Sequence, residues 1–146
     1  MDGTVRALGQ TAVRLGTDAA QVVAEISADA LAGDEVLAFP WQGSDGTASG
    51  DVFAPKPWKA YDLLPSRLTH AVTATGDGFE IALSVAALAP FVAVESDVPG
   101  RFSANAMTLF PRHEARITFT PADPGAAPNF TFRDLHSATY GQERTP

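Results

Sequence analysis

LTHAVTATGDGFEIALSV, residues 68–85, is the stretch of sequence that most clearly indicates how this chain folds. From Phe79 to Val85 the apolar side chains recur at every second position, and this period of two is typical of a half-buried β-strand. Residues 68–75 alternate in the same way, and Gly-Asp-Gly at 76–78 separates the two runs. Two alternating runs around such a turn predict an antiparallel β-hairpin.

Further strands are predicted downstream of this hairpin. The chain contains 11 prolines and 12 glycines, and short apolar or alternating runs lie between them, which is the rhythm of a β-sandwich or barrel. Phe102 and Phe119 are expected in the core from their phase, and Ile117, Phe130 and Phe132 also mark buried faces. The predicted strands are 91–96, 102–110, 115–120 and 129–135. We therefore expect an all-β, antiparallel sandwich.

The first third of the chain carries weaker signals. A helix over 17–31 is one interpretation, because Thr17 can act as an N-cap and apolar side chains fall on one helical face. The adjacent Val22 and Val23 and the flanking runs favour strands instead. On that interpretation, strands are predicted at 5–8, 12–15, 21–27, 35–42 and 49–54, with a turn at 43–46.

A connector links this first third to the rest. Residues 54–59 read Ala-Pro-Lys-Pro-Trp-Lys, and the two prolines stiffen the backbone there. We expect a boundary at this point. Residues 1–57 would be N-terminal strands, either extra strands of the sandwich or the tail of a preceding one, and 58–146 would be the sandwich itself.

Composition limits the classes of partner. Seventeen acidic residues against ten basic ones give a net charge of -7, so the field of the molecule repels a phosphate backbone and no nucleic acid is expected. No run approaches the length of about 20 apolar residues that spans a bilayer, so no membrane partner is expected. We expect a soluble protein of the bacterial cytoplasm or periplasm, and the absence of cysteine does not distinguish these compartments.

The sequence shows no catalytic constellation. None of the three histidines, His70, His113 and His136, lies in a motif that would orient a nucleophile or bind a metal. The acidic pairs Glu95 with Asp97 and Asp134 with Glu143 are interpreted as solvated charges, because nothing sets either pair across a cleft. We expect no catalytic residue, no metal site and no cofactor.

Three aromatic side chains lie near turns or connectors, and flat rings there are typical of surfaces on which sugars stack. They are Trp41, Trp58 and Tyr61. The alternative is structural: Trp41 would pack as core at the end of a strand, while Trp58 and Tyr61 would pin the connector onto a neighbouring surface. These three residues are the candidates for contact with a sugar or with another domain.

The second half of the chain resembles the C-terminal immunoglobulin-like domain of bacterial β-mannosidases of glycoside hydrolase family 2. That family has an Ala-x-x-Val-x-Val-Glu strand, then Gly-Arg-Phe-Ser-Asp-Asn, a Leu-Leu-Pro-Gly-Glu turn, an alternating strand and a closing Leu-His-Ser. The matching residues here are Ala89 to Glu95, Gly100, Arg101, Phe102, Ser103, Asn105, Leu109, Pro111, Ile117, Phe119 and Asp134 to Ser137. Together with the connector, the resemblance covers about 49–140.

The sequence departs from the family at three places. Ala104 stands in place of an aspartate, Ala106-Met107 in place of an aromatic position, and Arg112-His113 in place of the Gly-Glu turn. The last change predicts a different turn geometry. Gly100 is expected to supply a permissive backbone after Pro99, and Asn105 to bond turn backbone, so the run has a structural account without a ligand.

The resemblance implies a non-catalytic accessory domain. The parent enzyme would remove terminal β-linked mannose with two glutamates on a (β/α)₈ barrel, and a barrel of about 250 residues cannot lie within these 146. The expected partners are the other domains of that glycosidase. Two alternatives use the same immunoglobulin-like fold: a module that binds a mannose-containing oligosaccharide, and a protein-recognition domain unrelated to hydrolysis.

Overall fold

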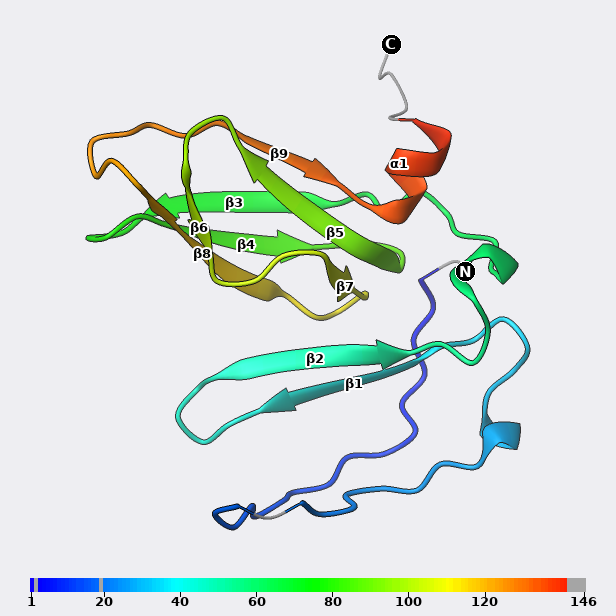
Figure 1. Cartoon of the computed structure of the whole chain (residues 1–146). Helices are drawn as coiled ribbons and strands as arrows, with labels where there is room; N and C mark the ends of the chain where they lie inside the picture. The colour runs from blue at the N-terminus through cyan, green and yellow to red at the C-terminus, as the bar shows by residue number, and fades with distance from the viewer. Residues whose placement is uncertain (2, 19, 142–146) are drawn as a thin grey trace.

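The computed structural model describes residues 1, 3–18 and 20–141, and it shows a β-sandwich with a separate β-hairpin beside it (Figure 1). One sheet of the sandwich has four strands in the order β3-β4-β8-β6, and the facing sheet has three in the order β7-β5-β9. The strands of the sandwich are β3 (Thr69–Ala74), β4 (Phe79–Ser84), β5 (Ala89–Ser96), β6 (Gly100–Phe102), β7 (Met107–Leu109), β8 (Ala115–Pro121) and β9 (Phe130–Arg133).

The predicted hairpin forms β3 and β4, and the backbone N–H of Thr75 donates to the carbonyl of Gly78 across the turn, at 2.8 Å. Ile81 lies opposite Ile117 and Phe79 opposite Phe119, so the alternating apolar residues of β4 and β8 share one face. That face packs against β5 and β7 to form the core. The buried side chains of the core are Ile81, Leu83, Val85, Ala89, Val92, Val94, Leu109, Ile117 and Phe119. The expected all-β antiparallel sandwich is confirmed.

Two predicted strands differ from the structure. The run expected as one strand over 102–110 forms two short strands, β6 and β7, which belong to opposite sheets. The strand expected over 129–135 ends at Arg133, and helix α1 (Leu135–Tyr140) follows. Asp134 is the N-cap of that helix: its carboxylate accepts from the backbone N–H of Ser137 at 2.7 Å, and this capping box ends the strand.

In the first third, two of the expected strands form and three do not. β1 (Leu37–Gln42) and β2 (Ala48–Phe53) make a two-stranded antiparallel sheet, and a turn with the Gly43 N–H bonded to the Thr47 carbonyl joins them. No strand forms over 5–8, 12–15 or 21–27, where the chain finds no ladder partner. The alternative helix over 17–31 is also wrong: among residues 17, 18 and 20–31, which the structure describes, the one helical element is a short 3₁₀ turn, Ala28–Ala30.

The hairpin of β1 and β2 packs beside β7 through its smallest residues. A Cβ added to Gly50 would lie 3.0 Å from the Cα of Pro40 and 3.1 Å from the Phe110 ring, so only a glycine leaves room for this close approach. The Phe110 ring also stacks on His113, with centroids 4.7 Å apart. This contact sets which face of the hairpin turns toward the sandwich.

Candidate functional site

The two faces of the hairpin differ sharply in side-chain size. Alternation along β1 puts Leu37, Phe39 and Trp41 on one face, and Phe53 joins them because it lies opposite Leu37. The other face, which turns toward Phe110, has no aromatic side chain and carries Ala38, Pro40, Gln42, Ala48, Gly50 and Val52. We call the four residues Leu37, Phe39, Trp41 and Phe53 the hairpin apolar face.

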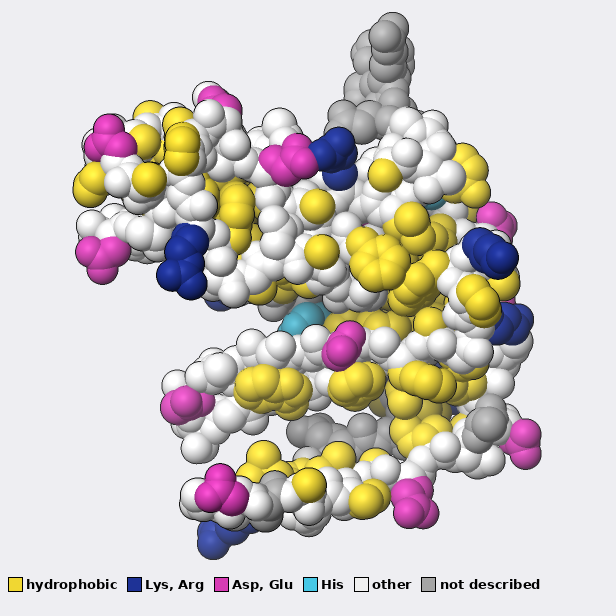
Figure 2. Space-filling model, in the orientation of Figure 1, with side chains coloured by type: hydrophobic (Ala, Val, Ile, Leu, Met, Phe, Trp, Pro, Cys, Tyr) yellow, Lys and Arg dark blue, Asp and Glu magenta, His cyan; other side chains and the backbone are white. Residues whose placement is uncertain are grey.

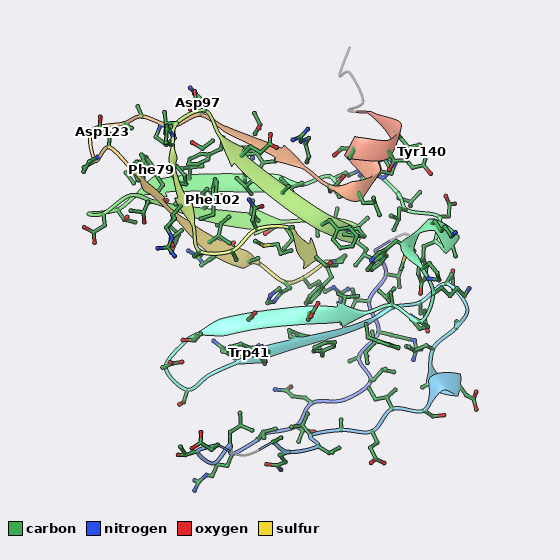
Figure 3. The ribbon with its side chains drawn as sticks, viewed as in Figure 1. Trp41, Phe79, Asp97, Phe102, Asp123 and Tyr140 are labelled. Atoms are coloured by element: carbon green, nitrogen blue, oxygen red, sulfur yellow. The ribbon has the colours of Figure 1, made fainter. Side chains whose placement is uncertain are left out.

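This face is largely open to solvent. The exposed fractions are 48% for Phe39, 54% for Trp41 and 56% for Phe53. Figure 3 shows Trp41 on the hairpin, well apart from the sandwich, and Figure 2 shows hydrophobic side chains gathered along the hairpin and the segment below it. The alternative that Trp41 packs as core is therefore wrong.

The chain starts beside the sandwich, where Gly3 lies against Ala86, and the segments that follow run on the side of the hairpin away from the sandwich (Figure 1). These segments carry further apolar surface. Side chains there that are exposed include Val5, Leu8, Val13, Leu15, Val22, Val23 and Ile26. Scattered apolar residues are normal on a protein surface, whereas a concentration of this kind beside three exposed aromatics is typical of contact surfaces. The candidate functional site is therefore this exposed apolar surface.

One ion pair ties these segments together. The guanidinium of Arg6 contacts the Glu35 carboxylate through two nitrogens, at 2.7 Å and 2.5 Å. The backbone N–H of Ala32 donates to the same carboxylate at 2.7 Å. These hydrogen bonds, first from Arg6 and then from Ala32, lower the pKa of Glu35 from its ordinary value of 4.5 to about 2.

The connector holds the other two candidate aromatics against the sandwich. Trp58 begins the 3₁₀ turn Trp58–Ala60, and its ring lies 5.8 Å from that of Tyr61 and 6.1 Å, edge to face, from that of Phe91. Tyr61 is buried, and its hydroxyl accepts from the backbone N–H of Lys56 at 3.2 Å. The structure thus joins Trp58 to Tyr61, while no ring contact among the described residues joins either of them to Trp41.

The motif at 100–103 continues the four-stranded sheet. A Cβ on Gly100 would lie 2.3 Å from the Phe119 ring, so the glycine is needed for close packing. Gly100 is not among the positive-φ residues, and the expected role of a permissive backbone is wrong. Phe102 is half-buried and packs on Phe119 at 4.7 Å. Arg101 is exposed, and Ser103 exchanges hydrogen bonds with the backbone of Thr118, both 2.9 Å long.

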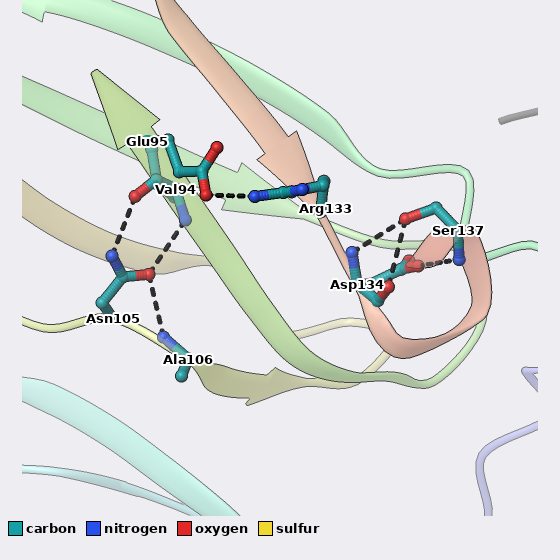
Figure 4. Close-up of polar contacts among 7 residues, drawn as sticks. All are labelled: Val94, Glu95, Asn105, Ala106, Arg133, Asp134 and Ser137. Atoms are coloured by element: carbon teal, nitrogen blue, oxygen red, sulfur yellow. Dashed lines mark hydrogen bonds and ion pairs between the residues drawn. The ribbon is translucent and has the colours of Figure 1, made fainter. Parts of the chain in front are cut away.

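Asn105 takes the place of a neighbouring strand beside β5 (Figure 4). Its side-chain oxygen accepts from the backbone N–H of Val94 at 2.9 Å, and its side-chain nitrogen donates to the Val94 carbonyl at 2.8 Å. The oxygen also accepts from the N–H of Ala106 at 2.9 Å. Because Val94 is buried, these two backbone groups would otherwise lack partners. Asn105 is therefore a structural residue that bonds strand backbone as well as turn backbone.

The acidic residues considered for catalysis have structural partners. Glu95 pairs with Arg133, and the Asp97 carboxylate accepts from the side chain and the backbone of Asn129, which lowers its pKa. Burial alone would raise the pKa of Asp134, but hydrogen bonds from Ser137 and Ser66 lower it overall. Glu143 lies outside the described residues.

Nothing in the described part of the chain groups three or more metal-ligating side chains. The same residues include no helix of the length and apolar character needed to cross a membrane.

Comparison with known families identifies the sandwich. A family model for the mannosidase Ig-fold domain matches residues 63–138. This chain belongs to the Ig_mannosidase family of Ig-fold domains. The match confirms the immunoglobulin-like fold and contains all strands from β3 to β9, whereas the hairpin of β1 and β2 lies outside it. The comparison with curated proteins found no match.

One residue with a left-handed backbone lies where the sequence of the Ig_mannosidase domain departs from the resembled pattern. Arg112, which stands in place of a glycine, has a φ of 64°, the region that glycine favours. A residue with a Cβ therefore holds a strained backbone conformation at this turn. The different turn geometry expected from Arg112-His113 stays a prediction.

Proposed function

We propose that this chain is a non-catalytic, C-terminal accessory domain of a larger bacterial β-mannosidase-like glycoside hydrolase of family 2. On this proposal, the paired carboxylates that cleave the glycosidic bond belong to another part of the parent enzyme. The Ig_mannosidase domain packs against that parent and helps to fix the arrangement of its domains.

One observation carries the proposal: the hairpin turns its small residues toward the sandwich and its large aromatic residues outward. A hairpin that served only to cover the sandwich would turn its apolar side chains inward. Burying the exposed halves of Phe39, Trp41 and Phe53 against another domain would contribute roughly 2–4 kcal/mol. This surface therefore suits a partner with an apolar face.

The first test is the reading frame that encodes the chain. The proposal expects a (β/α)₈ barrel with two catalytic glutamates upstream of residue 1, and a frame without a glycosidase would instead favour a protein-recognition domain. If the barrel is present, its domains can be produced separately and titrated with this chain in a calorimeter. We expect binding, and we expect the double variant Phe39→Ser/Trp41→Ser to lose it, while the control Tyr140→Ser, at an exposed position of α1 away from the hairpin (Figure 3), binds normally.

A second candidate function uses the same face. Phe39 and Trp41 lie two residues apart on a two-stranded sheet, with the polar Asp51 and Ser49 directly opposite them. Exposed rings flanked by hydrogen-bonding groups suit a mannose-containing oligosaccharide. Titration with mannohexaose tests it: a sugar module would bind, Trp41→Ala would abolish binding and Trp58→Ala would preserve it. If no heat of binding is measured at millimolar sugar, the sugar-binding function is rejected and the packing role is favoured.

A further inference from the structure

The two sheets of the sandwich differ by one strand, and the extra strand is left uncovered. β3 lies at one edge of the four-stranded sheet, and its residues His70 and Val72 lie opposite Leu83 and Ile81 of β4. Residues opposite each other in a ladder share a face, so Val72 points toward the core side. Yet Val72 is 42% exposed, whereas Ile81 is fully buried. The facing sheet lacks the strand that would cover β3.

The edge of the facing sheet beside β3 is β9, which pairs with β5 alone among the described strands. The backbone N–H of Asp97 donates to the carbonyl of Asn129 at 3.2 Å, which marks 97 and 129 as a hydrogen-bonded pair. Such pairs alternate along an antiparallel ladder, so Thr131 and Arg133 bond to β5. The N–H and C=O groups of Phe130 and Phe132 therefore turn toward the open edge.

The hydrogen bonds of Val94 in β5 agree with this assignment of the hydrogen-bonded pairs between β5 and β9. Its register partner is Phe132, and its own N–H and C=O are bonded by Asn105 on the far side of β5. Both members of this pair thus direct their backbone groups away from each other. On β5 the amide of Asn105 satisfies those groups, and on β9 nothing equivalent is seen in the described part of the chain.

A groove of about 370 Å³ runs between these two edge strands. It is lined by Leu68 and His70 on one side and by residues 130–133 on the other, together with Ser66 and with Asp134 and Ser137 at the start of α1. The His70 ring stacks on Phe132 across the groove, with centroids 4.1 Å apart. The groove thus combines the apolar side chains of Leu68, Phe130 and Phe132 with polar ones, and β9, with its open backbone groups, forms one side of it.

We propose that this groove binds an extended segment of another polypeptide, which adds to β9 as a fourth strand and covers β3. Four backbone groups spaced two residues apart fit a β-strand, and the uncovered face of β3 is one strand wide. Residues at alternate positions of the bound segment would face Leu68, His70 and Val72, so they should be apolar. The inference is independent of the proposed packing role, because the hairpin apolar face lies elsewhere on the molecule (Figure 1).

The edge strands favour a foreign segment over a second copy of this chain. β9, the strand that the segment would join, has no proline, and its one charged residue, Arg133, is paired with Glu95, so β9 carries little of the protection that commonly blocks pairing at an edge. Two copies, however, each carry a net charge of -7 and repel each other. A segment with basic residues at its ends would be attracted to the molecule.

The test uses the whole chain and a synthetic peptide, Lys-Thr-Val-Thr-Val-Thr-Val-Lys, with amide exchange followed by NMR. Without peptide, the amides of Phe130 and Phe132 should exchange much faster than those of Thr131 and Arg133. With peptide, the two phenylalanine amides should become protected. A control peptide with two of its valines replaced by proline cannot form the ladder and should give no protection.

Two matched variants locate the site. Val72→Glu places a charge on the groove side of β3, and Thr73→Glu places the same charge on the opposite face. We expect the first to weaken peptide binding by at least about tenfold and the second to leave it unchanged, since a buried carboxylate would lack a partner. The proposal is overturned if the free chain already protects Phe130 and Phe132. Protection that rises with protein concentration alone, or equal binding by both variants, would also overturn it.

Discussion

Phe119 should be the side chain on which the stability of the sandwich depends most. Its ring is 1% exposed, packs 4.7 Å from Phe102 and 5.3 Å from Phe130, and lies directly over Gly100. Truncating a buried phenylalanine costs about 3–5 kcal/mol, and aromatic pairs add about 0.5–1.5 kcal/mol beyond area. We place Phe119→Ala near the top of that range. Phe102 is only half-buried, so Phe102→Ala should cost about 1.5–3 kcal/mol.

Urea unfolding followed by circular dichroism measures both free energies, and the double variant adds a third. If the two rings stabilise each other, the double variant should be less destabilised than the sum by about 0.5–1.5 kcal/mol. Val72→Ala, at an exposed position of β3, is the control and should change stability by less than about 1 kcal/mol. A Phe119→Ala variant within 1 kcal/mol of the parent chain would refute the assignment of this core.

Three further outcomes are expected. Arg112→Gly should raise the free energy of unfolding by about 1 kcal/mol, since it relieves a positive φ; a lower melting temperature would speak against this. Asn105→Ala should lower that free energy by about 2–3 kcal/mol, because it leaves two buried backbone groups of Val94 without partners; a loss below 0.5 kcal/mol would not fit. The pKa of Glu35 followed by carbon NMR should lie near 2, so its ion pair persists fully above pH 4.5 and is lost as the pH falls through about 2; a midpoint near 4.5 would contradict the contact.

The sandwich could be predicted because the alternation of apolar and polar residues is visible within each of its main strands. In β4 and β8 every second side chain is apolar, and the structure buries that set. The split of 102–110 into two strands could not be predicted, because both halves look extended and only the sheet to which each pairs distinguishes them. The sequence does contain one indication of helix α1: Asp134 is followed three residues later by Ser137, the spacing at which an N-cap side chain accepts a hydrogen bond from the backbone.

The first third shows what alternation alone cannot decide. Residues 5–8 and 12–15 have strand-like sequences, but a strand also needs a partner strand with which its backbone forms hydrogen bonds. The local sequence pattern does not identify such a partner. The boundary at residue 57 stays a prediction. At the site, exposed aromatics are predicted as candidates from the sequence, whereas the hairpin register that puts Trp41 and Phe53 on the same face depends on pairing. Likewise, the amide of Asn105 was expected to bond backbone, but its target, Val94, required the fold.

The proposed packing role requires that Trp41 become buried when the parent's other domains bind. In a Trp58→Phe variant, Trp41 is the sole tryptophan, and its fluorescence reports the hairpin apolar face alone. On addition of the separately produced glycosidase domains, we predict a shift of its emission to shorter wavelength and protection from acrylamide quenching. Binding that leaves both the emission and the quenching of Trp41 unchanged would contradict the packing of the hairpin apolar face against the parent, because the contact would then lie elsewhere.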